Sequence, residues 1–294
     1  MNVILKENIR NNFRNIKKKM ISLFIFLIHN VIERLPDNVF VGVITNIQRI
    51  KKMDYSKHEI VLEINSPKEF MRLRACEREP WTVEWIESFT PGDIMFDIGA
   101  NVGSYSLIAS KFFEGKVTIY AFEPGFPNYP KLCKNIFINN CQENITPLPI
   151  ALSNLNKIDY FYYNNLSPGG ALHAFGNPVD HRGNDFKFVF KQKMLSCTID
   201  EVIKRFNVPP PNHMKIDVDG NELLVLRGAE ETLKSEILKS AIVEIHEGNN
   251  SGTDKIIEFF KERNMIIKSK HKNLFRKVSS PFSNESYYIF IRKA

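Results

Sequence analysis

The sequence lacks the cysteine pattern of a metal-binding or disulfide-rich protein. Its four cysteines are Cys76, Cys133, Cys141 and Cys197. None forms a Cys-x-x-Cys pair, and no zinc-finger spacing can be drawn through them with the seven histidines. Because the number of cysteines is even, disulfide bonds between them are still possible. Because we identify no cleavable leader, we nevertheless expect reduced thiols and a cytoplasmic protein, with membrane association as a further option.

Long apolar runs are also lacking. The stretch MISLFIFLIHNVI, residues 20–32, would at about 1.5 Å per helical residue fall well short of the ~30 Å hydrocarbon core of a bilayer. It follows the basic run Lys17, Lys18 and Lys19. Three interpretations stay open: a helix packed on the domain, which we favour, peripheral contact of residues 1–35 with a membrane surface, or an uncleaved signal-like anchor. We treat residues 1–57 as a helical extension and 58–294 as the main domain.

Positive charge is scarce in the body of the chain, although the formal net charge is +7. Residues 6–19 carry +5 and residues 261–277 carry +6, so the remainder carries −4. The binding groove of a nucleic-acid enzyme is basic, so we expect no nucleic-acid partner. The composition, 43% hydrophobic and 25% charged, is that of a globular protein. The oligomeric state stays open.

From residue 58 onward, strand patterns alternate with helix patterns. The segments 58–64 and 70–75 alternate like two paired strands, and 79–89 has helical spacing. Strands are then expected at 94–99, 116–123, 145–152, 157–163, 187–195, 213–220, 240–247, 265–270 and 286–293, and helices at 102–113, 127–139, 198–206, 221–234 and 253–263. This order predicts an α/β fold with a mostly parallel sheet and right-handed crossovers.

The segment MFDIGANVGSYSLIAS, residues 95–110, reads as a buried strand, a turn and a helix start. Its turn, Gly99 to Gly103, lacks the G-x-G-x-x-G spacing that fits a pyrophosphate, which counts against a nicotinamide oxidoreductase. Glu123 ends the next strand, 20 positions after Gly103, where an acid would bind both ribose hydroxyls. A ribose without a pyrophosphate suggests a nucleoside with an amino-acid tail, such as S-adenosylmethionine. We expect the amides of Gly99 to Ser104 to face the methionine end and Asp97 to orient the bound group.

Six stretches, in this order, resemble the FkbM family of S-adenosylmethionine-dependent methyltransferases: REPWTVEWI, DIGANVGSYSL, AFEP, IALSN, MKIDVDGNELLVLRGAEETL and VEIHEG. The resemblance runs from about Arg78 to Glu247. It implies a class I methyltransferase fold, Rossmann-like, with a seven-stranded sheet whose last strand is antiparallel. It also implies methyl transfer, usually to a hydroxyl oxygen, on sugars, glycolipid or oligosaccharide groups or polyketides.

The resemblance carries over to individual residues. Asp97, Gly99, Asn101 and Gly103 would line the methionine portion of the cofactor, Glu123 would bind the ribose, and Asp217 would lie beside the transferred methyl group. The family often has Glu where this chain has Asp219, which shortens the reach of that carboxylate. The remaining expected cofactor residues are Glu79, Ala100, Ser104, Pro124, Ala151 and Leu152.

Methylating a hydroxyl requires removal of its proton, so a base is expected at the ends of the fourth and fifth strands. Glu244 and His246 lie two apart and share one strand face. We take His246 as the first candidate base because a neutral imidazole is available near pH 7, although a merely structural histidine is an equal alternative. Asp217 or Glu222 would serve if burial raised its pKa. Together with Glu244 and His246, these carboxylates could instead bind Mg²⁺, but we favour the interpretation without a metal ion.

The insert of about residues 164–192 contains glycines beside aromatic and imidazole groups, among them His173 and His181. Such a segment suits a lid that touches an acceptor and closes the site, with His173 as a binding candidate. A plain polar loop is the alternative. Three other functions stay open: a nicotinamide oxidoreductase, a nucleic-acid methyltransferase and a non-catalytic, membrane-tethered protein with a cofactor fold.

Overall fold

The computed structural model describes residues 2–47, 49–178, 185, 187–247, 252–272 and 285–293, with side chains from residue 14 onward. The chain divides into two compact units, Met1–Arg49 and Ile50–Ala294. This division lies before the boundary that we expected at residue 57. The reason is that β1 (Ile50–Lys52) pairs with β2 (Val61–Glu63), and Met53 and Tyr55 are buried in the core of the second unit.

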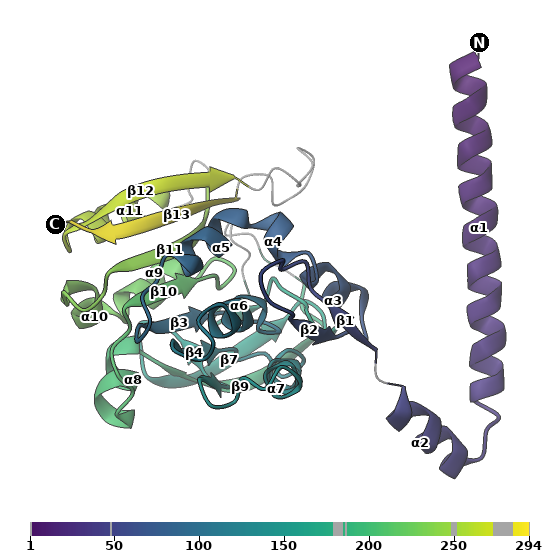
Figure 1. Cartoon of the computed structure of the whole chain (residues 1–294), viewed down its shortest axis with the longest axis horizontal. Helices are drawn as coiled ribbons and strands as arrows, with labels where there is room; N and C mark the ends of the chain where they lie inside the picture. The colour runs from purple at the N-terminus through teal and green to yellow at the C-terminus, as the bar shows by residue number, and fades with distance from the viewer. Residues whose placement is uncertain are drawn as a thin grey trace. The chain divides into compact units, whose positions relative to one another are not determined.

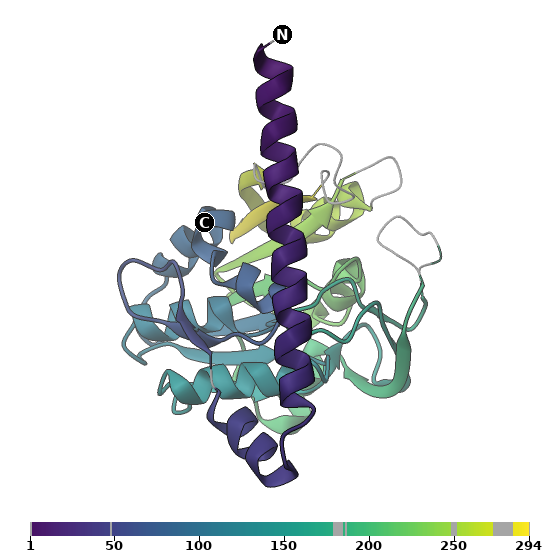
Figure 2. The same cartoon turned by 90° about the vertical axis from the view of Figure 1, so that its right-hand side faces the viewer.

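The first unit consists of two helices, α1 (Asn2–Ile32) and α2 (Asp37–Asn46). α1 is one uninterrupted helix in both views (Figures 1 and 2). Of the helices in the described ranges, none is both long enough and apolar enough to cross a membrane. The 13-residue apolar stretch therefore forms part of a longer helix that is basic over Lys17 to Lys19.

The second unit is built on a seven-stranded sheet with the order β12-β13-β11-β10-β3-β4-β5 (Figure 1). Its strands are β3 (Ile94–Ile98), β4 (Thr118–Phe122), β5 (Ile145–Leu148), β10 (His213–Ile216), β11 (Ser240–His246), β12 (Met265–Lys272) and β13 (Glu285–Arg292). β13 runs antiparallel to both of its neighbours, and the other pairs are parallel. The expected class I methyltransferase sheet with an antiparallel last strand is confirmed.

Helices cover both faces of this sheet, because its central strands are apolar on both sides. Met95 packs in one core cluster and the next residue, Phe96, in the other, as the alternation of a strand requires. The first cluster includes residues of α5 (Pro80–Glu87), α6 (Ser104–Phe112) and α7 (Tyr129–Ile138). The second includes residues of α8 (Ile199–Phe206), α9 (Glu222–Arg227), α10 (Glu230–Lys234) and α11 (Thr253–Lys261). The unit is thus a three-layer α/β/α domain.

A second, four-stranded sheet has the order β6-β9-β7-β8. Its strands are β6 (Ala151–Leu152), β7 (Lys157–Tyr163), β8 (Ala174–Phe175) and β9 (Phe190–Cys197). The strand that we expected over 145–152 is therefore divided between two sheets. Pro149 lies at the division, where it has no N–H to continue a ladder.

The strand predicted over residues 70–75 is wrong. Residues 67–78 form α3 (Pro67–Arg72) and α4 (Ala75–Arg78). Ser66 caps α3, because its side chain accepts a hydrogen bond from the Glu69 amide at 3.0 Å, and Pro67 occupies the first turn. The Glu69 carboxylate in turn accepts from the Asn65 amide at 2.8 Å. This capping pattern decides the local structure, although the apolar residues alternate.

Candidate active site

A cavity of ≈ 720 Å³ lies at the carboxyl ends of the central strands, where open α/β sheets bind ligands. Ile98, Phe122 and Glu244 line it from β3, β4 and β11, and Asp217 directly follows β10. The expected site residues in its lining are Glu79, Gly99, Asn101, Glu123, Pro124, Ala151, Leu152, Asp217 and Glu244. Those outside the lining are Asp97, Ala100, Gly103, Ser104, Glu222 and His246. The structure thus gathers these residues from six separate stretches of the chain around one space.

The turn after β3 requires glycine at Gly99 because another chain segment approaches its backbone. Gly99 has φ +83°, and a Cβ there would lie 1.9 Å from the Asp217 carbonyl oxygen. A side chain at this position would push β3 and β10 apart at the edge of the cavity. The absence of a side chain at Gly99 therefore lets β3 and β10 pack closely, and Gly99 also lines the cavity.

The amides of this turn are used differently from our expectation. Those of Gly99 and Ala100 donate to the Phe122 carbonyl at 2.9 and 3.0 Å, and that of Gly103 donates to the Ala100 carbonyl at 2.8 Å. The Asn101 amide donates to the Glu123 carboxylate at 2.8 Å. These four N–H groups already have acceptors inside the protein, so they do not all face a ligand as predicted. The turn ties β3 to β4 and positions Glu123.

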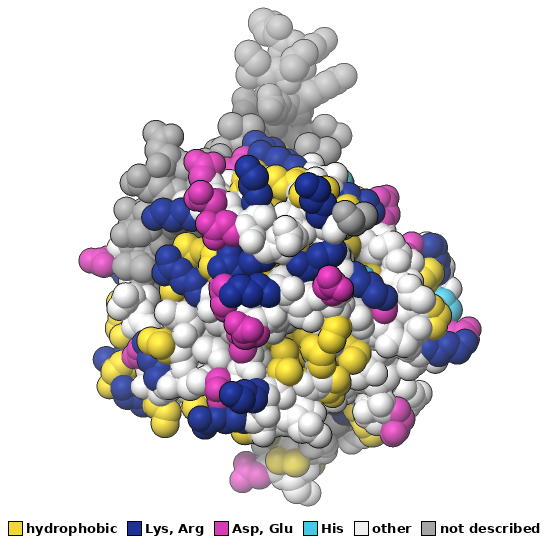
Figure 3. All heavy atoms as spheres, turned by 90° about the vertical axis from the view of Figure 1, so that its left-hand side faces the viewer, with side chains coloured by type: hydrophobic (Ala, Val, Ile, Leu, Met, Phe, Trp, Pro, Cys, Tyr) yellow, Lys and Arg dark blue, Asp and Glu magenta, His cyan; other side chains and the backbone are white. Residues whose placement is uncertain are grey.

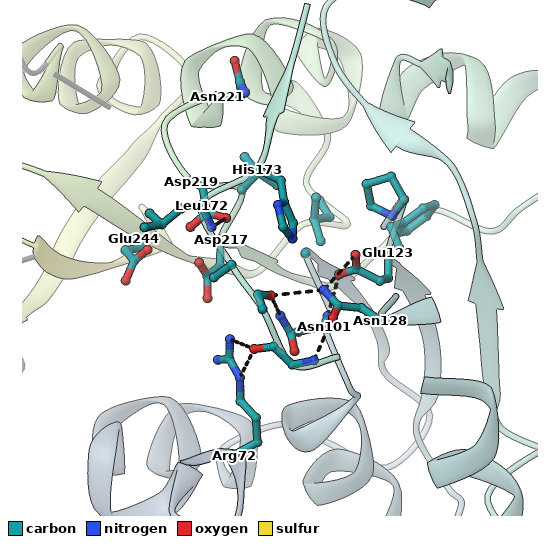
Figure 4. Close-up of a pocket in the computed structure, with 18 of the residues that line it drawn as sticks. Arg72, Asn101, Glu123, Asn128, Leu172, His173, Asp217, Asp219, Asn221 and Glu244 are labelled. Carbon is teal, nitrogen blue, oxygen red and sulfur yellow. Dashed lines mark hydrogen bonds between the residues drawn. The ribbon is translucent and has the colours of Figure 1, made fainter. Parts of the chain in front are cut away.

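Glu123 follows β4 and is only 5% exposed. Besides the Asn101 amide, its carboxylate accepts from the Gly125 amide at 2.8 Å and from the Asn128 side chain at 3.4 Å (Figure 4). Burial nevertheless raises the pKa of Glu123 to about 7, against the opposite effect of these donors. The structure therefore holds an acid with an unusually high pKa at the position expected to bind a ribose.

Asp97 does not line the cavity. It lies on the face of β3 that α6 covers, and it accepts a hydrogen bond from the Ser106 hydroxyl at 2.6 Å. Burial raises its pKa. In the structure Asp97 connects β3 to α6, so its influence on a bound group would be indirect.

Lys215 is a buried cation that the sequence analysis did not identify. It is 3% exposed, and its ammonium donates to the Asp217 carboxylate at 2.9 Å. Burial alone would raise the pKa of Asp217, but the charge and hydrogen bond of Lys215, with smaller contributions from Glu244 and Arg72, together lower that pKa to about 2. The signal was a lysine inside HMKID, a strand otherwise expected to be buried, where a charge requires a partner. Asp217 is consequently ionised but weakly basic.

Glu244 lies beside Tyr287, its cross-strand neighbour on β13. The Tyr287 hydroxyl is 2.5 Å from a Glu244 carboxylate oxygen and 3.1 Å from a Glu79 carboxylate oxygen. One hydroxyl proton can be donated to only one of these acceptors at a time. All three side chains line the cavity, and Tyr287, which sequence reasoning missed, links the carboxylates of Glu79 and Glu244.

The other two base candidates lie outside the cavity lining. The His246 ring is 3.8 Å from a Glu285 carboxylate oxygen, and Glu244, His246 and Glu285 each bring one oxygen or nitrogen atom within 4.8 Å of the others. Glu222 accepts from the amides of Gly220 and Val218, so it braces its own loop, and burial raises its pKa to about 7. Glu222 therefore does not join the group of ligands that we considered for Mg²⁺.

The insert reaches the cavity through residues 167–172, which we call the bridging loop. The Gly170 carbonyl accepts from Asn101 at 2.7 Å and from Asn128 at 3.2 Å, and the Gly169 carbonyl accepts from Arg72 at 3.1 Å (Figure 4). At its far end, the Leu172 amide donates to Asp219 at 2.7 Å. The loop thus connects α3, the glycine turn, the start of α7 and the loop after β10.

His173 follows the bridging loop and lines the cavity. Burial, with a smaller effect of Lys68, lowers its pKa to about 4. Asp219, which accepts from the loop, has its pKa raised to about 6 by burial and by Asp217. The second histidine of the insert, His181, lies outside the described residues.

Comparison with known proteins agrees with this architecture. A family model described as "Methyltransferase FkbM domain" matches residues 97–267. The hexuronic acid methyltransferase AglP of Haloferax volcanii is 29% identical, over 63% of this chain and 70% of that protein. The methyltransferase sdnD of Sordaria araneosa is 25% identical, over 55% of this chain and 70% of that protein.

Among solved structures, a precorrin-6y C5,15-methyltransferase from Geobacter metallireducens GS-15 aligns with a TM-score of 0.44 and 15% identity, covering 74% of this chain and 88% of that one. The family model covers more than half of the chain, and it includes the glycine turn, Glu123, Asp217 and Glu244. The chain therefore belongs to the FkbM family of S-adenosylmethionine-dependent methyltransferases.

Proposed function

We propose that this methyltransferase methylates a hydroxyl oxygen of a sugar or of a related glycan or glycolipid acceptor. The observation that carries the proposal is the shared cavity. It has Glu123 on one side and the carboxylates of Glu79, Asp217 and Glu244 on the other. A nucleoside and an acceptor hydroxyl can therefore be held in one space, as in-line transfer requires.

The residues of the cavity fit S-adenosylmethionine. In this proposal Glu123 accepts both ribose hydroxyls. It is supported by the position of Glu123 and Gly99 in the cavity lining and by the buried Asn101 Oδ1, which has no partner within the described part of the chain. Ile150, Ala151 and Leu152 supply an apolar wall for an adenine ring. When bound, the cofactor supplies a methyl group on a sulfonium, which an oxygen nucleophile attacks as the carbon–sulfur bond breaks.

Glu244 is the group that we assign to proton removal. Among the candidates from the sequence, Asp217 is held at a low pKa by Lys215, Glu222 faces its own loop and His246 does not line the cavity. Glu244 lines the cavity and is 5% exposed. As the new carbon–oxygen bond forms, the hydroxyl proton passes to the Glu244 carboxylate, with Tyr287 orienting it.

A sugar acceptor is supported by the name of the archaeal relative, a hexuronic acid methyltransferase. Membership of a methyltransferase family favours methyl transfer over the nicotinamide chemistry and the non-catalytic function considered from the sequence. A nucleic-acid substrate would favour a strongly basic surface. On the face drawn in Figure 3, Lys and Arg instead lie beside Asp and Glu.

The proposal is tested by incubating the protein with S-adenosylmethionine labelled in its methyl group and a glycan and glycolipid extract of the host. Label on a sugar hydroxyl is the expected result. Glu244→Gln should lower the rate by about 10²-fold or more while retaining affinity for S-adenosylhomocysteine. Glu231→Gln, an exposed change on α10, is the matched control. Full activity of Glu244→Gln would contradict the assignment, and no binding of either form of the cofactor would overturn the function.

We further infer that α1 contacts an anionic membrane surface. After the basic run, its exposed large apolar side chains are Met20, Ile21, Leu23, Phe24, Ile25, Phe26, Leu27, Ile28 and Val31. The three preceding lysines complement anionic head groups. Flotation with vesicles rich in phosphatidylglycerol should capture the full chain, and a Phe24→Glu, Phe26→Glu variant should stay behind. Equal flotation of both proteins would refute this contact.

A further inference from the structure

One part of the cavity presents hydrogen-bond donors and positive charge. Lys68 and Arg72 lie one helical turn apart on α3, and both line the cavity. Neither has a carboxylate oxygen within 4.0 Å among the ion pairs of the described residues. Like charges four residues apart on a helix repel each other. Arg72 lies near enough to Asp217 and Asp219 to lower the pKa of both carboxyls. Lys68 is exposed, and an anion in the cavity would complement its charge.

The imidazole of His173 adds an independent observation. This residue is 8% exposed, and the Asn164 amide donates to its Nδ1 at 3.4 Å. An imidazole that accepts at Nδ1 carries its proton on Nε2 when neutral. Nε2 is buried and has no hydrogen-bond partner within the ranges that the structure describes. Figure 4 shows the ring directed into the space between Asp219 and Glu123.

Lys68 and His173 both line the cavity, and the Lys68 backbone packs against Gly169 of the bridging loop, which precedes His173. Lys68 lies near enough to lower the pKa of His173, in addition to the larger effect of burial, so the ring is neutral at pH 7. Its Nε2 is therefore a donor and not a base. The Nε and Nη2 groups of Arg72 already donate to the Gly169 carbonyl, but the guanidinium keeps its positive charge. We call Lys68, Arg72 and the His173 Nε2–H the donor corner.

We propose that the donor corner binds an anionic group of the acceptor, a carboxylate or a phosphate monoester, so that the substrates are acidic sugars. This inference rests on the proposed function, because it names the class of sugar that the cavity selects. Glu79, Glu244 and Glu285 also line the cavity and would repel such a group, as would Asp219, which accepts from the Leu172 amide beside His173. An anion in the donor corner would consequently orient the acceptor as well as add affinity.

The test measures sugar binding by calorimetry, using D-glucuronate, glucose 6-phosphate and uncharged glucose as probes. Each titration is done on the full chain with and without S-adenosylhomocysteine. The variants are Lys68→Met, Lys68→Arg and His173→Phe. Arg74→Met is the matched control, because Arg74 also lines the cavity but already pairs with Glu77.

We expect at least one anionic sugar to bind about tenfold or more tightly than glucose. Which of the two binds distinguishes a carboxylate from a phosphate. Lys68→Met and His173→Phe should abolish this preference, whereas Lys68→Arg and Arg74→Met should keep it. The affinity for S-adenosylhomocysteine should stay unchanged in all four variants.

Equal binding of glucose, or no binding of either anionic sugar, would overturn the proposal. So would a Lys68→Met variant that loses S-adenosylhomocysteine instead, because the corner would then hold the carboxylate of the cofactor. Failure of the wild-type protein to bind S-adenosylhomocysteine refutes the proposed function separately.

Discussion

Glu123, the proposed ribose ligand, should make nucleoside binding depend on pH in a range where most carboxylates do not titrate. Its pKa is about 7 because the carboxyl is buried, and accepting two ribose hydroxyls requires the ionised form. As pH falls through 7, the protonated fraction grows and affinity decreases. Binding in turn favours the ionised form, so the pKa of Glu123 should fall in the complex.

The magnitude follows from the ionised fraction. With a pKa of about 7, roughly one molecule in eleven is ionised at pH 6 and roughly ten in eleven at pH 8. Since apparent affinity scales with the competent fraction, the Kd should be about tenfold weaker at pH 6 than at pH 8. Glu123→Gln should remove this slope and bind weakly at both pH values.

The assay is calorimetry with 5′-deoxy-5′-methylthioadenosine, which keeps the ribose diol and lacks the amino-acid tail whose own groups titrate. Glu222→Gln is the matched control, because Glu222 also has a pKa of about 7 but faces its own loop. That variant should keep the slope. A Kd that does not change between pH 6 and 8 in the wild-type protein, or a slope that survives in Glu123→Gln, would refute the assignment of Glu123.

Three further predictions concern the framework of the site. Gly99→Ala places a Cβ 1.9 Å from the Asp217 carbonyl oxygen at a positive φ, so it should destabilise the fold by about 2 kcal/mol or more in chemical denaturation and weaken S-adenosylhomocysteine binding; wild-type values would contradict the close approach. Lys215→Met removes the buried cation from the partly exposed Asp217 carboxylate and should lower the unfolding free energy at pH 7 by about 1–3 kcal/mol. Because Asp217 is then best buried as the neutral acid, the loss should diminish as pH falls, and a loss that does not change with pH would count against the pair. Ser66→Ala removes the cap of α3 and a hydrogen bond to the Pro168 carbonyl, and it should lower unfolding free energy by about 1 kcal/mol, with Ser66→Asp losing less.

Local sequence patterns predicted most of the secondary structure, because strand and helix periods reflect which side chains each element buries. The helix expected over 198–206 and the strand expected over 157–163 occur at those positions, and Thr198 caps the helix as its residue type suggests. The exception at 70–75 has a local cause too. Ser66, Pro67 and Glu69 signalled a helix start, and the alternating apolar residues concealed it.

The residues that meet in the cavity could be predicted only in part. Glu123 and Gly99 occupy positions that the strand–turn–helix order specifies, since parallel strands end at one edge of a sheet. The sequence alone thus predicted the fold class, the family and the edge of the sheet at which the cavity lies. Side-chain direction and partners were decided by tertiary packing. Asp97 turns toward α6, Glu222 braces its own loop, and α3 brings Lys68 to the cavity that His173 also lines, although the two residues are more than a hundred positions apart. The physical reason is that charge and desolvation depend on distance through space, and sequence spacing does not specify such distances between separate elements.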